Sequence, residues 1–147
     1  MAMQLTRAGE YAIKSLLYLA AQRMEARIMA SEVADAEKIP VNFVRKILES
    51  LAKTGLVKSF RGAGGGFTLG RRPEQITLRH VIEAVEGPLA LNQCLTPSAC
   101  ENLPLCAMSH IWMEAQHALE GVLDRYSLAD VAKTRLLRQQ AGMTTAD

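Results

Sequence analysis

Three cysteines lie close together in the second half of the chain, at Cys94, Cys100 and Cys106. Five residues separate each neighbouring pair, and each spacer holds a proline, so the segment can fold its three sulfurs around one centre. Cysteine thiolates bind iron–sulfur clusters and zinc. Three sulfurs leave one coordination position for a weaker oxygen or nitrogen ligand, through which oxygen, nitric oxide or iron shortage could change a cluster. The spacing therefore predicts a metal or redox site of the kind that a sensor uses.

The same residue types allow two other sites. Cys106 and His110, with Cys94 and Cys100 before them, offer the three sulfurs and one nitrogen that zinc accepts in structural sites. The thiols could also stay free of metal and act as a redox switch, in which a reactive thiolate forms a disulfide. The odd number of cysteines, in a chain without a recognisable secretory signal, argues against a disulfide framework.

Length and composition limit the class of protein. The chain has 147 residues, of which 49% are hydrophobic and 22% charged, and this suits one globular domain or one domain with a helical arm. No apolar run reaches the length of a membrane span, about 18 residues, and the first residues do not resemble a signal peptide. No Ser/His/Asp set or pair of carboxylates suggests catalysis. We therefore expect a cytoplasmic protein that binds no membrane and is not an enzyme.

The charge of the chain is divided unevenly. Residues 1–80 contain 13 Lys and Arg against 7 Asp and Glu, whereas residues 81–147 contain 4 against 8. The first part thus carries a net charge of +6 and the second a net charge of −4. A basic N-terminal part predicts that this part meets a polyanion, with ordinary solvated charge as the alternative.

Apolar residues at helical spacing predict three helices in the first half of the chain. The first covers residues 7–25, and the second covers 31–37 with Ser31 as its N-cap. The third begins at Pro40 and ends at Gly55, because proline suits the first turn of a helix and glycine its end. Its apolar stripe, expected to face the core, consists of Val41, Val44, Ile47, Leu48 and Leu51.

After Gly55 the spacing changes to that of short strands. Residues 56–60 and 67–70 flank the glycine-rich run 61–66, which predicts a β-hairpin with a mobile, basic tip. The run lacks the spacing of a nucleotide-binding loop, and a strand rather than a helix follows it, so we expect no phosphate cradle for a nucleotide. Two helices, a turn, a third helix and a two-stranded wing are the order of a winged helix-turn-helix. The predicted fold class is therefore mainly α with a small β-hairpin wing.

The second half is predicted to begin with a helix over 77–86 and to continue as a cysteine loop, a long helix and a capped terminal helix. The long helix carries apolar residues at i, i+4 and i+7 for about twenty residues. An amphipathic helix of this length needs a surface to pack on, and a second copy of the chain would supply it, so we expect a homodimer. The predicted segments are the winged helix-turn-helix (1–86), the cysteine-rich loop (87–106), the dimerisation and terminal helices (107–141) and a flexible tail (142–147).

Five residues are candidates for DNA contact. Asn42, Arg45 and Lys46 lie on the polar face of the third helix, which in a helix-turn-helix enters the major groove. Arg61 and Gly64 lie in the wing tip, where a cation beside glycines suits a phosphate or minor-groove contact. The alternative for the three helical residues is a solvated helix face.

Several segments carry a family resemblance: MQLTRAGEYAIKSLLYLA at the start, IPVNFVRKILESLAKTGLVKSFRGAGGGFTLGR through the third helix and the wing, and ITLRHVIEAVEG before the cysteines. Over residues 3–135, the chain resembles the Rrf2 family of bacterial transcription regulators, which includes the IscR-like and NsrR-like groups. The resemblance implies a homodimer joined by the long helix, with each subunit binding half of a palindromic double-stranded DNA operator. It also implies that the three cysteines hold an iron–sulfur cluster whose state alters DNA affinity.

The fourth ligand is where the chain departs from the family pattern. In the IscR-like pattern a histidine lies three positions after the last cysteine, where this chain has Ser109; His110 is one residue further on and turned by about 100°. In NsrR-like members an acidic residue near the start of the first helix reaches the cluster from the other subunit, and Glu10 matches that position. The resemblance implies Glu10, in preference to His110, as the fourth ligand of a 2Fe–2S or 4Fe–4S cluster. A carboxylate placed only to favour the helix dipole is the alternative for Glu10.

Overall fold

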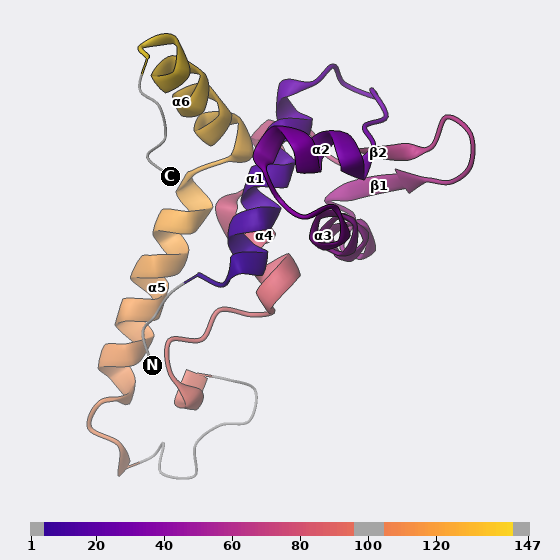
Figure 1. Cartoon of the computed structure of the whole chain (residues 1–147). Coiled ribbons are helices and arrows are strands. Elements are labelled where there is room, and N and C mark those ends of the chain that lie inside the picture. The colour runs from indigo at the N-terminus through magenta and orange to yellow at the C-terminus, as the bar shows by residue number, and fades with distance from the viewer. Residues whose placement is uncertain (1–4, 96–104, 143–147) are drawn as a thin grey trace.

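The computed structural model describes residues 5–95 and 105–142. Figure 1 shows their arrangement, in which the helices surround a small core and one hairpin projects from it. The fold class predicted from the sequence is confirmed, because the described residues are mainly helical and contain one two-stranded antiparallel sheet. The elements are α1 (Arg7–Ala21), α2 (Ala30–Glu37), α3 (Val41–Lys53), β1 (Val57–Phe60), β2 (Gly66–Leu69), η1 (Pro73–Gln75), α4 (Leu78–Glu86), η2 (Gln93–Leu95), α5 (Ser109–Arg125) and α6 (Leu128–Gln140).

The hydrophobic core lies between the first four α-helices and the wing. Leu16 of α1, Val33 of α2 and Leu48 of α3 are completely buried there. Burial of one such side chain contributes about 1.5–3 kcal/mol, so this cluster provides the main stabilisation of the first domain. It also fixes α3 against α1, which determines the face that α3 presents to solvent.

The apolar stripe of α3 is confirmed except at its first residue. Val44, Ile47, Leu48 and Leu51 are buried as predicted, but Val41 is 37% exposed. Residues 41–43 are all exposed, so the start of α3 projects beyond the core and helical spacing alone does not bury a side chain there.

The first two helices have different ends from those predicted. α1 ends at Ala21 rather than near Glu25, which has a left-handed backbone with φ of 69°. α2 begins at Ala30, so that Ser31 lies inside the helix and is not its cap. The cause is a pairing that helical spacing does not reveal: Ile28 exchanges two backbone hydrogen bonds of 2.8 Å with Phe67, which holds the chain extended directly before α2.

The wing is anchored to the domain along this pairing. In the hairpin, Val57 pairs with Leu69 and Phe60 with Gly66, and Ile28 adds a third short stretch beside β2. Gly66 has φ of 134°, and a Cβ there would lie 2.9 Å from the carbonyl oxygen of Ile28. Only glycine permits this close approach, so the glycine run serves packing as well as a tight turn.

The C-terminal helices contact the first four helices at several places, and the start of α6 is one of them. Leu128 donates a 2.7 Å backbone hydrogen bond to Ile76, and Leu78 donates one of 3.1 Å to Tyr126, so the start of α6 lies beside the start of α4. The capping box of Ser127 and Asp130 predicted for the terminal helix is confirmed. α5 runs along one side of the domain as a long bar (Figure 1), and none of its residues is buried. Within the described ranges, no helix is both long and apolar enough to cross a membrane.

Candidate nucleic-acid interface and cysteine segment

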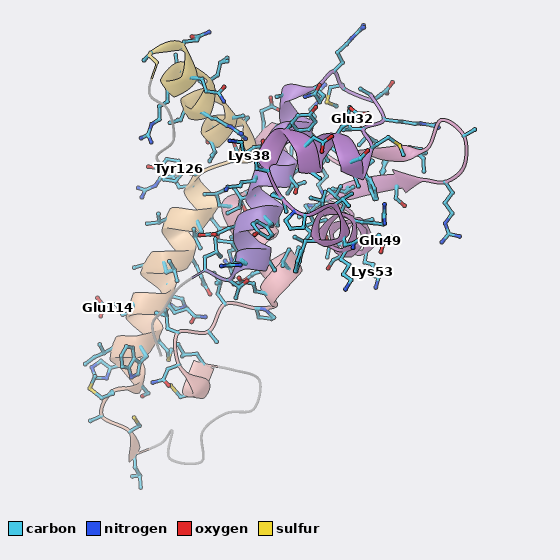
Figure 2. The ribbon with its side chains drawn as sticks, in the orientation of Figure 1. Glu32, Lys38, Glu49, Lys53, Glu114 and Tyr126 are labelled. Atoms are coloured by element: carbon cyan, nitrogen blue, oxygen red, sulfur yellow. The ribbon has the colours of Figure 1, made fainter. Side chains whose placement is uncertain are left out.

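Helix α3 presents a polar face on the side opposite its buried stripe. Asn42, Arg45 and Lys46 are all exposed, and their spacing of three and four residues places them on one face of the helix. Glu49 and Lys53 continue this face toward the C-terminal end, and Figure 2 shows both pointing outward from α3. The three candidate residues therefore lie together on a surface that can enter a groove of DNA.

An aromatic contact that the sequence analysis missed supports the exposed first turn of α3. The ring of Phe43 is 55% exposed and meets Tyr11 of α1 edge to face, with centroids 6.1 Å apart. Such a pair adds about 0.5–1.5 kcal/mol beyond burial, so it stiffens the start of α3 against α1. The sequence signal that could have revealed this contact is the phenylalanine next to Asn42, in the exposed start of α3.

The wing tip carries the second group of candidates. Arg61 is exposed, and Gly64 has a left-handed backbone with φ of 75°. The carbonyl of Gly64 accepts a 2.9 Å hydrogen bond from Nη1 of Arg27, whose guanidinium also lies 4.0 Å from the centroid of the Phe60 ring. Arg27 belongs to the segment between α1 and α2, and the sequence analysis did not connect it with the wing.

A basic hollow of about 620 Å³ lies beside the wing. Four cations, Arg27, Lys58, Arg71 and Arg72, and one carboxylate, Glu25, are among its lining residues. Exposed cations therefore lie both on the polar face of α3 and on the wing and its base. Such a surface favours a polyanion and steers its approach.

The cysteine segment is described only at its two ends. Cys94 in η2 and Cys106 just before α5 are half-buried free thiols. Cys100 lies outside the described residues, and so do residues 96–104 as a whole. Among residues 5–95 and 105–142, no three His, Cys, Asp or Glu side chains gather as metal ligands. Two free thiols at the ends of one short segment nevertheless have the donor chemistry that iron–sulfur clusters and zinc require.

The two candidates for the fourth ligand lie on different helices. Glu10 is exposed in the first turn of α1, and His110 is exposed in the first turn of α5. Between the last cysteine and His110, the hydroxyl of Ser109 donates a 3.1 Å hydrogen bond to the carbonyl of Cys106, which fixes the entry into α5.

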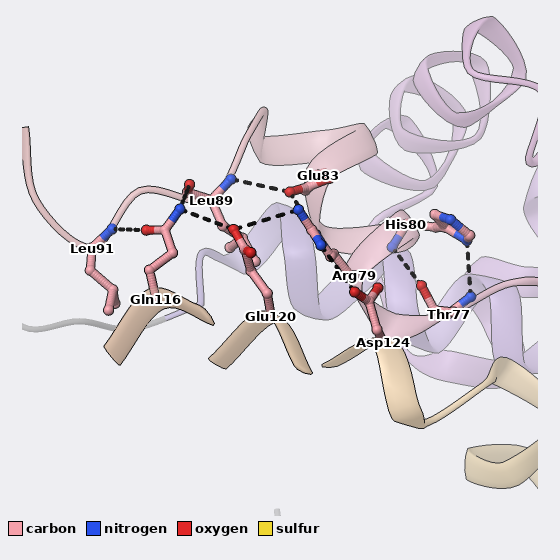
Figure 3. Close-up of polar contacts among 9 residues, drawn as sticks. All are labelled: Thr77, Arg79, His80, Glu83, Leu89, Leu91, Gln116, Glu120 and Asp124. Atoms are coloured by element: carbon pink, nitrogen blue, oxygen red, sulfur yellow. Dashed lines mark hydrogen bonds and ion pairs between the residues drawn. The ribbon is translucent and has the colours of Figure 1, made fainter. Parts of the chain in front are cut away.

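A set of polar contacts joins the segment that leads to Cys94 with α5 (Figure 3). The amide of Gln116 accepts a 2.9 Å hydrogen bond from the backbone of Leu91 and donates one of 2.6 Å to the carbonyl of Leu89. Its Nε2 also donates to Glu120, 3.1 Å away on the next turn of α5. The chain between α4 and η2 is therefore held on the surface of α5.

The same set continues into α4 through Arg79. Its guanidinium contacts Asp124 at 3.0 Å, Glu83 at 3.1 Å and Glu120 at 3.5 Å (Figure 3). Hydrogen bonds to Asp124 and then Glu83 raise the pKa of Arg79. We name these five residues the α4–α5 strut: Arg79, Glu83, Gln116, Glu120 and Asp124. The sequence analysis missed it, although the four-residue spacing of Gln116, Glu120 and Asp124 places them on one face of α5.

Together, the helix-turn-helix, the exposed basic face of α3 and the basic wing define a winged helix-turn-helix transcription regulator. A model of the Rrf2 family, described as an iron-dependent transcriptional regulator, matches residues 5–134. The chain belongs to this family, as the resemblance in its sequence implied.

Three similar proteins illustrate the range of the family. The regulator NsrR of Bacillus subtilis (strain 168) is 32% identical over 135 residues, which span 90% of this chain and 92% of that protein. The structure of CymR, the global cysteine regulator of B. subtilis, has a TM-score of 0.73 at 26% identity and covers 90% of this chain and 98% of its own. The structure of IscR from T. potens has the same TM-score and identity, and covers 99% and 96% respectively.

These comparisons establish the general activity. The chain is a transcriptional regulator of a DNA-binding family, and its relatives are regulators rather than enzymes, in agreement with the prediction.

Proposed function

We propose that this protein is a dimeric operator-binding regulator whose DNA affinity depends on an iron–sulfur cluster held by Cys94, Cys100 and Cys106. The observation that carries the proposal is the position of the cysteine segment. Cys94 follows the segment that Gln116 holds on α5 at Leu91, and Cys106 lies three residues before α5 begins. A change at the cysteines would therefore act on the segment before η2 and on the start of α5.

The DNA-binding roles follow from the exposed basic surface. Asn42, Arg45 and Lys46 would face base edges and phosphates in the major groove, with α3 as the recognition helix. Arg61 would reach a phosphate or the minor groove from the wing, where Gly64 lets the backbone approach closely.

Helix α5 supplies the dimer contact in this proposal. Its 17 residues make it about 25 Å long, yet none is buried in the single chain. Ile111, Met113 and Val122 are exposed apolar residues along it, and Figure 2 shows Tyr126 at its end pointing away from the core. A second copy of α5 would cover such a surface, because identical faces can pack around a two-fold axis.

The cysteines would hold the cluster as thiolates, with Glu10 of the partner subunit or His110 as the fourth ligand. A bound cluster supplies redox and ligand-exchange chemistry that responds to oxygen, nitric oxide or iron supply. The residues of the chain do the rest. Gln116 keeps Leu89 and Leu91 on α5, and Arg79 keeps α5 on α4, so movement at the cysteines is passed to the packed domain that carries α3.

An absorption spectrum with iron, sulfide and zinc analysis of protein purified without oxygen tests the cofactor. We expect brown protein with iron and acid-labile sulfide, and a spectrum changed by Glu10→Ala more than by His110→Ala. Colourless protein with zinc would support the structural zinc site that the spacing of Cys106 and His110 favours. Colourless protein without metal would leave a thiol switch in a DNA-binding regulator.

A further inference from the structure

We propose that Arg27 is a positioning residue, which holds the wing tip in one conformation and thereby presents Arg61 to DNA. The inference rests on the proposed function, because it explains how Arg61, one of the proposed DNA contacts, is held in position. Arg27 lies outside both the recognition helix and the wing, in the segment between α1 and α2.

The side chain of Arg27 contacts residues on both sides of the wing tip. Its guanidinium lies over the ring of Phe60 at 4.0 Å and donates a 2.9 Å hydrogen bond to the carbonyl of Gly64. Phe60 directly precedes Arg61, and Gly64 lies three residues after it. One side chain therefore fixes the chain on both sides of Arg61.

The backbone at Arg27 is itself held in place. Its neighbour Ile28 exchanges two backbone hydrogen bonds of 2.8 Å with Phe67 of β2. The position of the Arg27 backbone relative to the wing is thus set by the sheet, and only the side chain has to be ordered. The planar guanidinium can stack on a ring and donate to a carbonyl at the same time, which the ammonium of lysine cannot do in this geometry.

The tip needs such a restraint because of its glycines. Gly62 and Gly64 both have left-handed backbones, with φ of 81° and 75°. Glycine loses more conformational freedom on ordering than any other residue, so an unrestrained tip would have to be ordered when DNA binds. A restraint already present in the free protein removes that cost and raises affinity without touching DNA.

Direct phosphate contact by Arg27 is the competing explanation, because Arg27 also lines the basic hollow with Lys58, Arg71 and Arg72. A double-mutant cycle separates the two, since positioning acts through Arg61 and direct contact does not. The probe is the tightest-binding duplex selected by the wild-type protein from a random-sequence library. We expect Arg27→Ala to weaken binding about tenfold in the wild-type background and less than about twofold in the Arg61→Ala background. Arg27→Lys should restore little of the loss.

Hydrogen exchange of the free protein gives a second readout. Arg27→Ala should speed exchange of the backbone amide of Gly65, which donates a 2.9 Å hydrogen bond to the carbonyl of Gly62 across the tip. Exchange in the core of α1 and α3 should not change. Arg23→Ala, which removes an exposed cation from the same segment, is the matched control and should affect neither exchange nor the cycle.

The outcomes are distinct. If the wild-type protein selects no duplex, the proposed function fails and this inference with it. If the wild type binds but the effects of Arg27→Ala and Arg61→Ala add, or if exchange at the tip is unchanged, the positioning role is overturned and DNA binding stands.

Discussion

Arg61 and the side chains of α3 differ in what each can recognise. Arg61 lies on a glycine-rich tip, where a cation suits contact with phosphate or a groove edge and would read little sequence. We expect Arg61→Ala to weaken binding to all duplexes and to lower the slope of log affinity against log salt concentration by about one. Titrations at several salt concentrations measure both. Loss of preference at a single base position instead would show that Arg61 reads a base.

Asn42 and Arg45 lie on the face of α3 that is proposed to meet base edges. Asn42→Ala or Arg45→Ala should each relax specificity at one base pair by about 1–3 kcal/mol, because a bidentate contact to that base is lost. Competition between single-base variants of the selected duplex measures this. Lys53→Ala, at the far end of the same helix, is the control. Unchanged selectivity in both variants would place these two residues outside the groove.

At the residue scale, the sequence predicted which candidate side chains are exposed but not the contacts that surround them. Asn42, Arg45, Lys46 and Arg61 are exposed as predicted, because exposure follows from helical spacing and from the glycine run. Arg27 was missed because its partners lie more than thirty residues away in the sequence, at Phe60 and Gly64. Contacts of this kind depend on the sheet register, which periodicity does not show.

The attachment of α6 to α2 is testable at the scale of elements. Nη2 of Arg135 lies 2.7 and 2.9 Å from the two carboxylate oxygens of Glu37, whose side chain is only 6% exposed. Arg135→Ala should lower the free energy of unfolding by about 1–3 kcal/mol, because it leaves a nearly buried carboxylate without this partner. Urea unfolding against Arg138→Ala, an exposed cation on the same helix, measures the difference. Equal stability of the two variants would show that the ion pair does not hold α6.

The start of α6 gives a pH dependence. The carboxylate of Asp130 accepts hydrogen bonds from the backbone and then the hydroxyl of Ser127, and these lower its pKa below the ordinary value of 3.8. A lowered pKa means that the carboxylate stabilises the folded state above the unfolded pKa and loses this effect as pH falls through the folded pKa. The difference in free energy of unfolding between wild type and Asp130→Ala should therefore become smaller at acidic pH. Urea unfolding at neutral pH and near pH 3 tests this, and a difference independent of pH would contradict it.

The elements themselves were largely predictable, and the wrong predictions have two causes. α3, the wing and the capped α6 follow from local signals such as apolar spacing, glycines and the Ser127 capping box. The end of α1 and the start of α2 were misplaced because Ile28 is held by Phe67, which is distant in sequence. Val41 was misplaced because spacing does not tell how far a helix extends beyond the core.

At the scale of the whole molecule, two separate surfaces account for the charge distribution. Several basic residues of the first domain lie on α3 and around the wing, whereas Arg79 of α4 is paired with the acidic Glu120 and Asp124 of α5. Cys94 and Cys106 therefore lie outside the proposed DNA surface, and in the proposed function their state would reach it through α5 and α4. This division is what a regulator needs if its signal is to alter DNA binding without occupying the DNA surface.

The most direct test of this account is the affinity of one anaerobic preparation for the selected duplex before and after removal of its cluster. We expect affinity to change at least tenfold, the size of a typical coupling between two sites, and the Cys106→Ala variant to match the cluster-free protein. Equal affinity with and without the cluster would contradict the central claim, and would leave a DNA-binding regulator whose cysteines do not control it.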